Sequence, residues 1–105
     1  MKALEALADP TRRRIVELLA AGDLEAGSIA ANFPVSRPAV SRHLRVLREA
    51  GLVRARSEAQ RRVYSLNPTP LAEVEEWLSR YRMFWTNRLD ALDTHMRRRA
   101  RKERT

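Results

Sequence analysis

The chain contains no cysteine, so it cannot form disulfides, thiolate metal sites or a cysteine nucleophile. It has only three glycines, and none of them forms the glycine-rich loop that cradles a phosphate. No apolar run approaches the roughly 18 residues that a transmembrane helix needs. There is also no Ser/His/Asp set and no group of carboxylates in a pocket-forming context. These absences argue against an enzyme, a cofactor and a membrane partner. Because the N-terminal residues also lack the features of a secretory signal, we expect the cytoplasm.

The positive charge is concentrated in two segments. The formal net charge is +8 over 105 residues, a length typical of one compact domain. Residues 36–62 carry eight arginines against two acids, and residues 97–105 carry six basic groups against one acid. A basic run at a terminus is usually a solvated tail, so we expect residues 97–105 to be disordered. The internal cluster favours a polyanionic partner.

The first third of the chain predicts three short helices. Residues 2–8 favour a helix, and a second helix starts after Asp9, a good N-cap, with Pro10 at its first position. Gly22 is expected to end that second helix. Residues 24–33 suit a third helix. The next helix should therefore follow a tight turn.

The remainder predicts a helix, a hairpin and a long helix. Ser36 caps a helix over about 36–50, with Gly51 as the residue that ends it. Residues 52–66 alternate like two strands around a polar turn. A long helix follows over about 70–96.

These elements together predict a mainly α fold with a small β-hairpin wing. The order is that of a winged helix-turn-helix, with one domain over residues 1–96. The helix at 36–50 would be the recognition helix, and the helix at 70–96 would serve dimerisation.

The recognition helix separates apolar and polar residues cleanly. At about 100° per residue, Val40, His43, Leu44 and Leu47 fall on one face, where we expect His43 to be a packed, hydrogen-bonded residue. An α-helix fits the DNA major groove, and a guanidinium can donate two hydrogen bonds to guanine. The polar face and its flanks predict contacts with double-stranded DNA by Ser36, Arg37, Pro38, Ser41, Arg42, Arg45 and Arg48.

The hairpin adds a second group of arginines. They surround its tip and are expected to contact phosphates or the adjacent minor groove: Arg54, Arg56, Arg61 and Arg62. The alternative is that the arginines of both elements are only solvated surface charges. Their position after a helix-turn-helix favours DNA binding.

The long helix carries an apolar stripe that a single small domain cannot easily cover. Trp77 and Phe84 add a second apolar edge, so one side would pack on the body and the other on a second copy. We expect the homodimer interface to contain Leu4, Leu7, Leu71, Val74, Leu78, Tyr81, Trp85, Leu89, Leu92 and Met96.

Two segments closely resemble a known family. Residues 7–15 (LADPTRRRI) and 35–53 (VSRPAVSRHLRVLREAGLV) are similar to the winged-helix repressors of the ArsR/SmtB type. The resemblance covers about residues 3–96. It implies a homodimer that binds an imperfect palindrome in its own or a neighbouring promoter, usually as a repressor. It also implies that the N-terminal and C-terminal helices form the dimer interface.

The metal sites of that family are not matched. Its arsenic, lead and cadmium sensors carry a Cys-x-Cys pair in the third-helix region, and this chain has no cysteine. Its zinc and nickel sensors carry Asp-x-His at the last helix and a second histidine about eleven residues later. Asp93 and His95 match that start, but no histidine follows His95. The chain therefore resembles the metal-independent branch, with no metal site expected.

Three functions remain open at this level. The favoured one is a sequence-specific homodimeric repressor that binds a palindromic operator. A second is a regulator released from DNA by a metal or a small apolar effector, for which a crevice between the long helix and the body, lined by Trp77, Tyr81, Phe84 and Trp85, would be the site. The third is a non-specific nucleoid-type DNA-binding protein. The sequence does not identify an effector.

Overall fold

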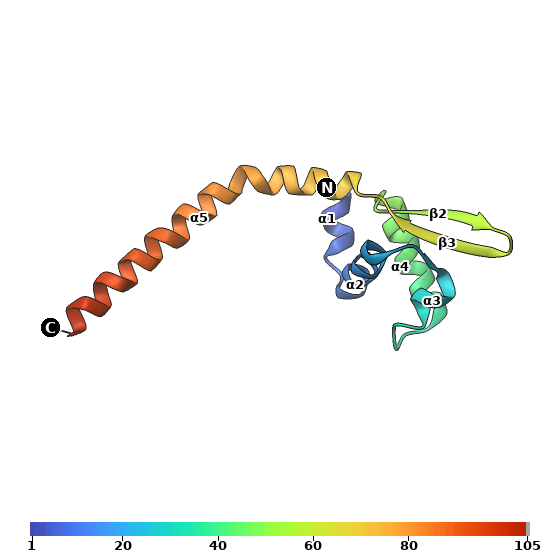
Figure 1. The fold of residues 1–105 in the computed structure, drawn as a ribbon, viewed down its shortest axis with the longest axis horizontal. Coiled ribbons are helices and arrows are strands. Elements are labelled where there is room, and N and C mark those ends of the chain that lie inside the picture. The colour runs from blue at the N-terminus through green and yellow to red at the C-terminus, as the bar shows by residue number, and fades with distance from the viewer. Residues whose placement is uncertain (105) are drawn as a thin grey trace. The chain divides into compact units, whose positions relative to one another are not determined.

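The computed structural model describes residues 1–104, with side chains through residue 102. It has the mainly helical architecture with a small sheet and a long C-terminal helix that the sequence predicts (Figure 1). In chain order the elements are α1 (Lys2–Leu7), α2 (Pro10–Ala21), β1 (Leu24–Glu25), α3 (Ala26–Ala30), α4 (Arg37–Glu49), β2 (Val53–Glu58), β3 (Arg61–Leu66) and α5 (Thr69–Arg104).

The start of α2 follows directly from its local sequence. Asp9 is the N-cap, and its carboxylate accepts a hydrogen bond of 3.0 Å from the backbone N–H of Arg12. Pro10 occupies the first turn, where its missing N–H costs no hydrogen bond. The predicted start of this helix is therefore confirmed.

The sheet corrects the prediction of a third helix over residues 24–33. Leu24 and Glu25 form β1, which pairs antiparallel with β3 opposite Tyr64 and Val63. Only residues 26–30 of the predicted segment are helical, as α3. The strand order is β1-β3-β2, so β3 has a hydrogen-bonded neighbour on both sides. This pairing satisfies backbone groups along an edge that a two-stranded hairpin would leave open.

A single core joins these elements within the unit Met1–Val74. α2 and α4 pack against each other, α2 packs on β3, and α4 packs on β2. The buried residues of this core are Ala3, Ala6, Ile15, Leu19, Ile29, Val40, Leu44, Leu47, Leu52, Val53, Tyr64 and Val74.

The C-terminus of α4 is closed by a Schellman motif. Gly51 has a φ of 76°, which a residue without a Cβ adopts at no steric cost. The backbone N–H of Leu52 donates to the carbonyl of Leu47, and that of Gly51 donates to Arg48, both at 2.9 Å. The side-chain amide of Asn67 then donates to the Gly51 carbonyl at 2.8 Å. The end of α4 is thereby fastened to the end of the wing.

α5 is longer than the sequence predicts. It continues to Arg104, whereas the sequence predicts its end near residue 96. Thr105 lies outside the described residues. By contacts the chain divides into Met1–Val74 and a second unit that starts at Glu75. No helix in the described part of the chain is both long and apolar enough to cross a membrane.

Candidate nucleic-acid interface

α4 presents a polar surface because its apolar face is fully used in the core. Ser36 caps the helix by accepting a hydrogen bond of 3.3 Å from the backbone N–H of Ala39. Leu44 and Leu47 on the inner face are 2% and 0% exposed. The predicted contact residues of the helix and its cap are all exposed: Ser36, Arg37, Pro38, Ser41, Arg42, Arg45 and Arg48.

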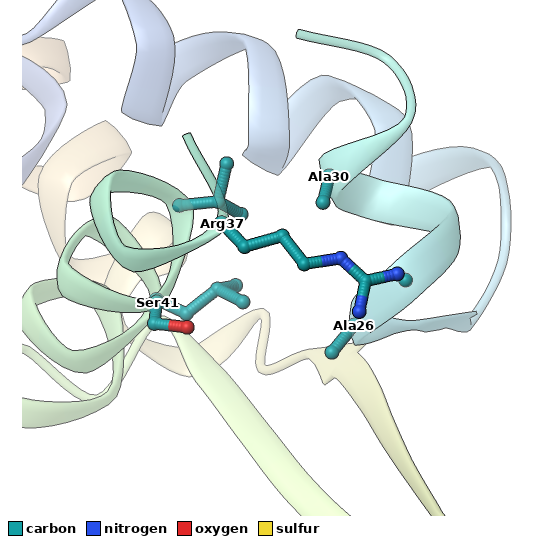
Figure 2. Close-up of a pocket in the computed structure, with 7 residues that line it drawn as sticks. Ala26, Ala30, Arg37 and Ser41 are labelled. Carbon is teal, nitrogen blue, oxygen red and sulfur yellow. The ribbon is translucent and has the colours of Figure 1, made fainter. Parts of the chain in front are cut away.

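Arg37 lies apart from the other arginines of α4. Its side chain extends from the start of α4 across to α3, as Figure 2 shows. There it lines a hollow of about 160 Å³ together with Ala26, Gly27 and Ala30 of α3. Its Nη2 would lie 3.7 Å from a Cβ built on Gly27. Arg37 therefore lies between the two helices of the helix-turn-helix, whereas the sequence placed it on a flank of the polar face of α4.

His43 connects α4 to the start of α2. Its Nδ1 lies 3.3 Å from Nη1 of Arg12 and 3.9 Å from Oδ2 of Asp9. A guanidinium only donates, so Nδ1 accepts this bond when it carries no proton, whereas a proton on Nδ1 would face the Asp9 carboxylate. His43 is hydrogen-bonded, as expected, with its side chain 23% exposed. The sequence contained no signal for the contact with Arg12, because 31 residues separate the two positions.

Arg12 also fastens α1. Its Nε–H donates to the carbonyl oxygen of Ala6 at 2.6 Å. One side chain thus contacts the C-terminal part of α1 and the middle of α4. The backbone N–H of Arg12, followed by weaker attraction from His43, lowers the pKa of the Asp9 carboxyl from its ordinary value of 3.8. This polar cluster connects α4 to α1 and to the start of α2.

The four wing arginines are not equivalent. Nη1 of Arg56 lies 2.7 Å from Oδ2 of Asp23, and its Nε lies 3.0 Å from Oε1 of Glu58. Hydrogen bonds to these two carboxylates raise the pKa of Arg56.

The next two arginines differ in their partners. Nη1 of Arg61 lies 3.0 Å from Oε1 of Glu25 in β1. The guanidinium of Arg62 instead lies over the ring of Tyr64, 5.7 Å from its centroid. Arg54 is exposed. The sequence grouped the four arginines as one set, whereas the structure pairs two of them with carboxylates.

The predicted dimer-interface residues fall into two groups. Val74 is 8% exposed and belongs to the core of its own chain. Leu4, Leu7 and Leu71 are partly buried against the same core. The remaining six are exposed on α5: Leu78, Tyr81, Trp85, Leu89, Leu92 and Met96.

The aromatic residues of α5 form a shallow surface of their own. The rings of Trp77 and Tyr81 are 5.2 Å apart. These two residues, with Leu78 and Trp85, line a hollow of about 400 Å³. Phe84 instead contacts Trp85 edge-on and carries the guanidinium of Arg88 over its ring at 4.8 Å.

Asp93, which matches the start of the family's zinc site, is paired with an arginine in this structure. Oδ2 of Asp93 lies 3.1 Å from Nη2 of Arg97, one turn further along α5. Within the described residues, no group of three or more His, Asp or Glu side chains is arranged to hold a metal ion. At this position Asp93 is therefore ion-paired with Arg97 on the exposed surface of α5.

Known proteins share both the sequence and this geometry. Residues 9–55 match the family model described as bacterial regulatory protein, arsR family. The HTH-type transcriptional regulator Rv2034 of Mycobacterium tuberculosis is 54% identical over 88 residues, which cover 84% of this chain and 79% of that protein. The transcriptional repressor SdpR of Bacillus subtilis is 42% identical over 74 residues, covering 70% and 82%.

A solved structure extends the likeness to the fold. The crystal structure of a possible transcriptional regulator for arsenical resistance matches this chain with a TM-score of 0.73 and 46% sequence identity. The match covers 88% of this chain and 93% of that one. The expected winged-helix fold is confirmed, and so is the expectation of a regulator in place of an enzyme. With a family match, close relatives and a solved neighbour that agree, this chain belongs to the ArsR family of DNA-binding transcriptional regulators.

Proposed function

We propose that this chain is a homodimeric cytoplasmic repressor that binds an imperfect palindrome in its own or a neighbouring promoter. The observation that carries the proposal is the outer face of α4. Arg42, Arg45 and Arg48 are exposed there, and none of the three has a carboxylate partner among the described residues. Their guanidinium groups are free to donate to base edges and phosphates in the major groove.

The dimer is supported by the apolar side of α5. Leu78 and Leu89 are 44% and 63% exposed, and the other four exposed members of the predicted interface continue the same stripe. Soluble proteins rarely leave a contiguous apolar stripe of this length open. A second copy of the same helix is the partner whose apolar spacing matches it. A two-fold dimer would then place two α4 helices on half-sites about one helical turn, roughly 34 to 36 Å, apart.

The repressor role is supported by the name of the relative SdpR, a transcriptional repressor. Footprinting at physiological salt, on DNA upstream of the gene that encodes this chain, tests the proposal. The expected result is one protected region with two symmetric halves, and a promoter reporter that becomes more active when the gene is deleted. Equal protection of operator and random DNA would replace the proposal by non-specific, nucleoid-type binding. Lower reporter activity after deletion would identify an activator.

A second candidate is an effector-responsive regulator, favoured by the aromatic hollow on α5. Its lining by Trp77, Leu78, Tyr81 and Trp85 suits an apolar ligand. All four residues come from one helix, so the hollow is open on its outer side in a single chain. Intrinsic tryptophan fluorescence, followed across a panel of apolar metabolites and metal ions with operator DNA present, tests this idea. A ligand that changes the fluorescence and releases the DNA would support it.

A further inference from the structure

The wing is a sheet with two chemically different faces. Residues directly opposite each other in antiparallel strands project to the same face. Val53 lies opposite Leu66, Ala55 opposite Tyr64, and Ser57 opposite Arg62. Val53 and Tyr64 are buried in the core that contains the inner residues of α4. This face, which we call the inner face, is therefore turned toward the helices.

Arg62 is the one arginine of the wing on the inner face. It lies two residues before the buried Tyr64 in β3 and therefore nearer to the hairpin tip. There the strands extend past α3 and α4 (Figure 1). The ring of Tyr64 supports its guanidinium at 5.7 Å and leaves the N–H groups at the rim to donate. Within the described residues, Arg62 has no ion-pair partner. Its charge is thus displayed on the same side of the sheet as α4.

On the opposite face of the wing, which we call its outer face, two arginines are paired with carboxylates. Arg56 lies opposite Val63, Glu58 lies opposite Arg61, and β1 places Glu25 on the other side of Val63. Val63 is 6% exposed between these ion-paired side chains. The pairs of Arg56 with Asp23 and of Arg61 with Glu25 connect the hairpin to the segment that follows α2.

The charges of the two faces favour different roles. A phosphate that approached Arg56 or Arg61 would meet the carboxylates that already accept their hydrogen bonds, and it would have to displace them. A phosphate that approached Arg62 meets an unpaired guanidinium on a rigid aromatic support. The cost of replacing a partner is absent at Arg62 and present at the other two.

We propose that, of Arg56, Arg61 and Arg62, it is Arg62 that binds a DNA phosphate, whereas Arg56 and Arg61 are positioning residues that hold the wing on the body through Asp23 and Glu25. This inference rests on the proposed function, because it assumes that α4 and the wing bind the same DNA.

The experiment compares Arg62→Ala with Arg61→Ala in the full chain. The two positions are adjacent and lose the same charge, so long-range attraction to DNA falls equally in both variants. Affinity for the footprinted site and for random DNA is measured against salt concentration. We expect Arg62→Ala to reduce the slope of log affinity against log salt by about 0.9 per protomer, the value for one phosphate contact, on both DNAs. Arg61→Ala should leave the slope nearly unchanged.

Two further variants separate contact from positioning. Arg62→Lys keeps the charge and should restore most of the slope. Glu25→Gln should have the same effect on DNA affinity as Arg61→Ala. The variant that combines both substitutions should bind DNA no more weakly than either single variant. If Glu25→Gln instead raises affinity and steepens the slope, Glu25 competes with phosphate for Arg61 and the proposal is overturned. Equal slopes for Arg61→Ala and Arg62→Ala would overturn it as well.

Two controls distinguish misfolding of a variant, and failure of the proposed function, from failure of the present inference. Far-ultraviolet circular dichroism confirms that each variant retains its helices before binding is measured. The unaltered chain on operator and random DNA tests sequence specificity without reference to the wing. A specific wild-type protein with equivalent arginine variants contradicts only the present inference. A non-specific wild-type protein contradicts the proposed function.

Discussion

α4 and the part of α5 after Val74 both carry an apolar stripe at helical spacing, but the two stripes meet different surroundings. Leu44 and Leu47 of α4 are buried by other elements of the same chain. Leu89 and Leu92 of α5 are 63% and 54% exposed. The spacing of apolar residues thus specifies which side of a helix is apolar. It does not specify whether the same chain or another molecule covers that side. One stripe stabilises the protomer, and the other is available to a second molecule.

The largest expected effect is the loss of a buried leucine from α4. Leu47→Ala removes methyl groups from a fully buried site, so we expect the free energy of unfolding to fall by about 2–5 kcal/mol. Leu92→Ala, the same change on α5, is the matched control and should cost far less at a protein concentration that keeps the chain monomeric. Urea unfolding monitored by circular dichroism measures both. Similar losses would mean that the α5 stripe is buried within its own chain.

A charge on the apolar stripe of α5 should break the proposed dimer. Leu92→Glu would bring two carboxylates close to each other in a two-fold interface, where burial and repulsion both oppose association. We expect the dimer dissociation constant to rise by about a hundredfold or more, equivalent to roughly 2.7 kcal/mol. Asn87→Glu adds the same residue to the polar side of the helix and should leave the dimer intact. Sedimentation equilibrium distinguishes the two results, and an unchanged dimer in Leu92→Glu would place the interface elsewhere.

The outer face of α4 should affect DNA recognition without affecting stability. Arg42→Ala removes an exposed guanidinium, and we expect the preference for operator over random DNA to fall by about 1–3 kcal/mol if that group contacts a base in two places. Arg14→Ala on α2, whose side chain pairs with Glu17, loses the same charge away from α4. Competition binding with both DNAs measures the preference. A uniform loss of affinity on both DNAs would assign Arg42 to a phosphate.

Asp9, which caps α2 and lies beside His43 of α4, should make the stability of the fold depend on pH in the acid range. The pKa of Asp9 is lowered in the folded protein, so its contribution to stability is present above pH 3.8 and is lost as the pH falls through the folded pKa. Asp9→Asn retains a capping oxygen but cannot titrate, whereas Asp9→Ala loses the cap and should cost about 1 kcal/mol. Urea unfolding between about pH 5 and pH 2 measures the difference. A difference between the native chain and Asp9→Asn that stays constant with pH would show that Asp9 does not contribute in this way.

The smallest effect on stability is expected at the exposed ion pair between Asp93 and Arg97 on α5. Asp93 lies one turn before Arg97, the favourable order for a carboxylate and a guanidinium on a helix. Because both side chains are solvated, Asp93→Asn should lower stability by no more than about 0.3–0.5 kcal/mol. The change should disappear at high salt. A larger, salt-independent loss would indicate that this end of α5 is covered.

Local chemistry accounts for the parts of the structure that could be predicted. The bounds of α4 agree with the expected 36–50 to within a residue, because Ser36 and Gly51 act on the backbone groups next to them. The wing strands likewise follow from alternating residues around a short turn. The start of α2 follows from Asp9 and Pro10 in the same way.

The errors concern contacts between distant positions. Leu24 and Glu25 have the composition of a helix start, but β3 recruits them as a strand opposite Tyr64 and Val63. The side chain of Arg12 reaches His43 across 31 residues, and that of Arg56 reaches Asp23 across 33. The last helix also extends beyond its expected end near residue 96, because α5 continues to Arg104.

The sequence by itself determined the order of the elements, the inner and outer faces of α4 and the excess of arginine around it. These properties depend on capping groups and on side-chain periodicity, which act over a few residues. Only the tertiary structure decided which wing arginines are already paired, where Arg37 lies, and which of the two apolar stripes is covered by its own chain. Those outcomes depend on where a neighbouring element brings a carboxylate or an apolar surface, and no local pattern encodes that position.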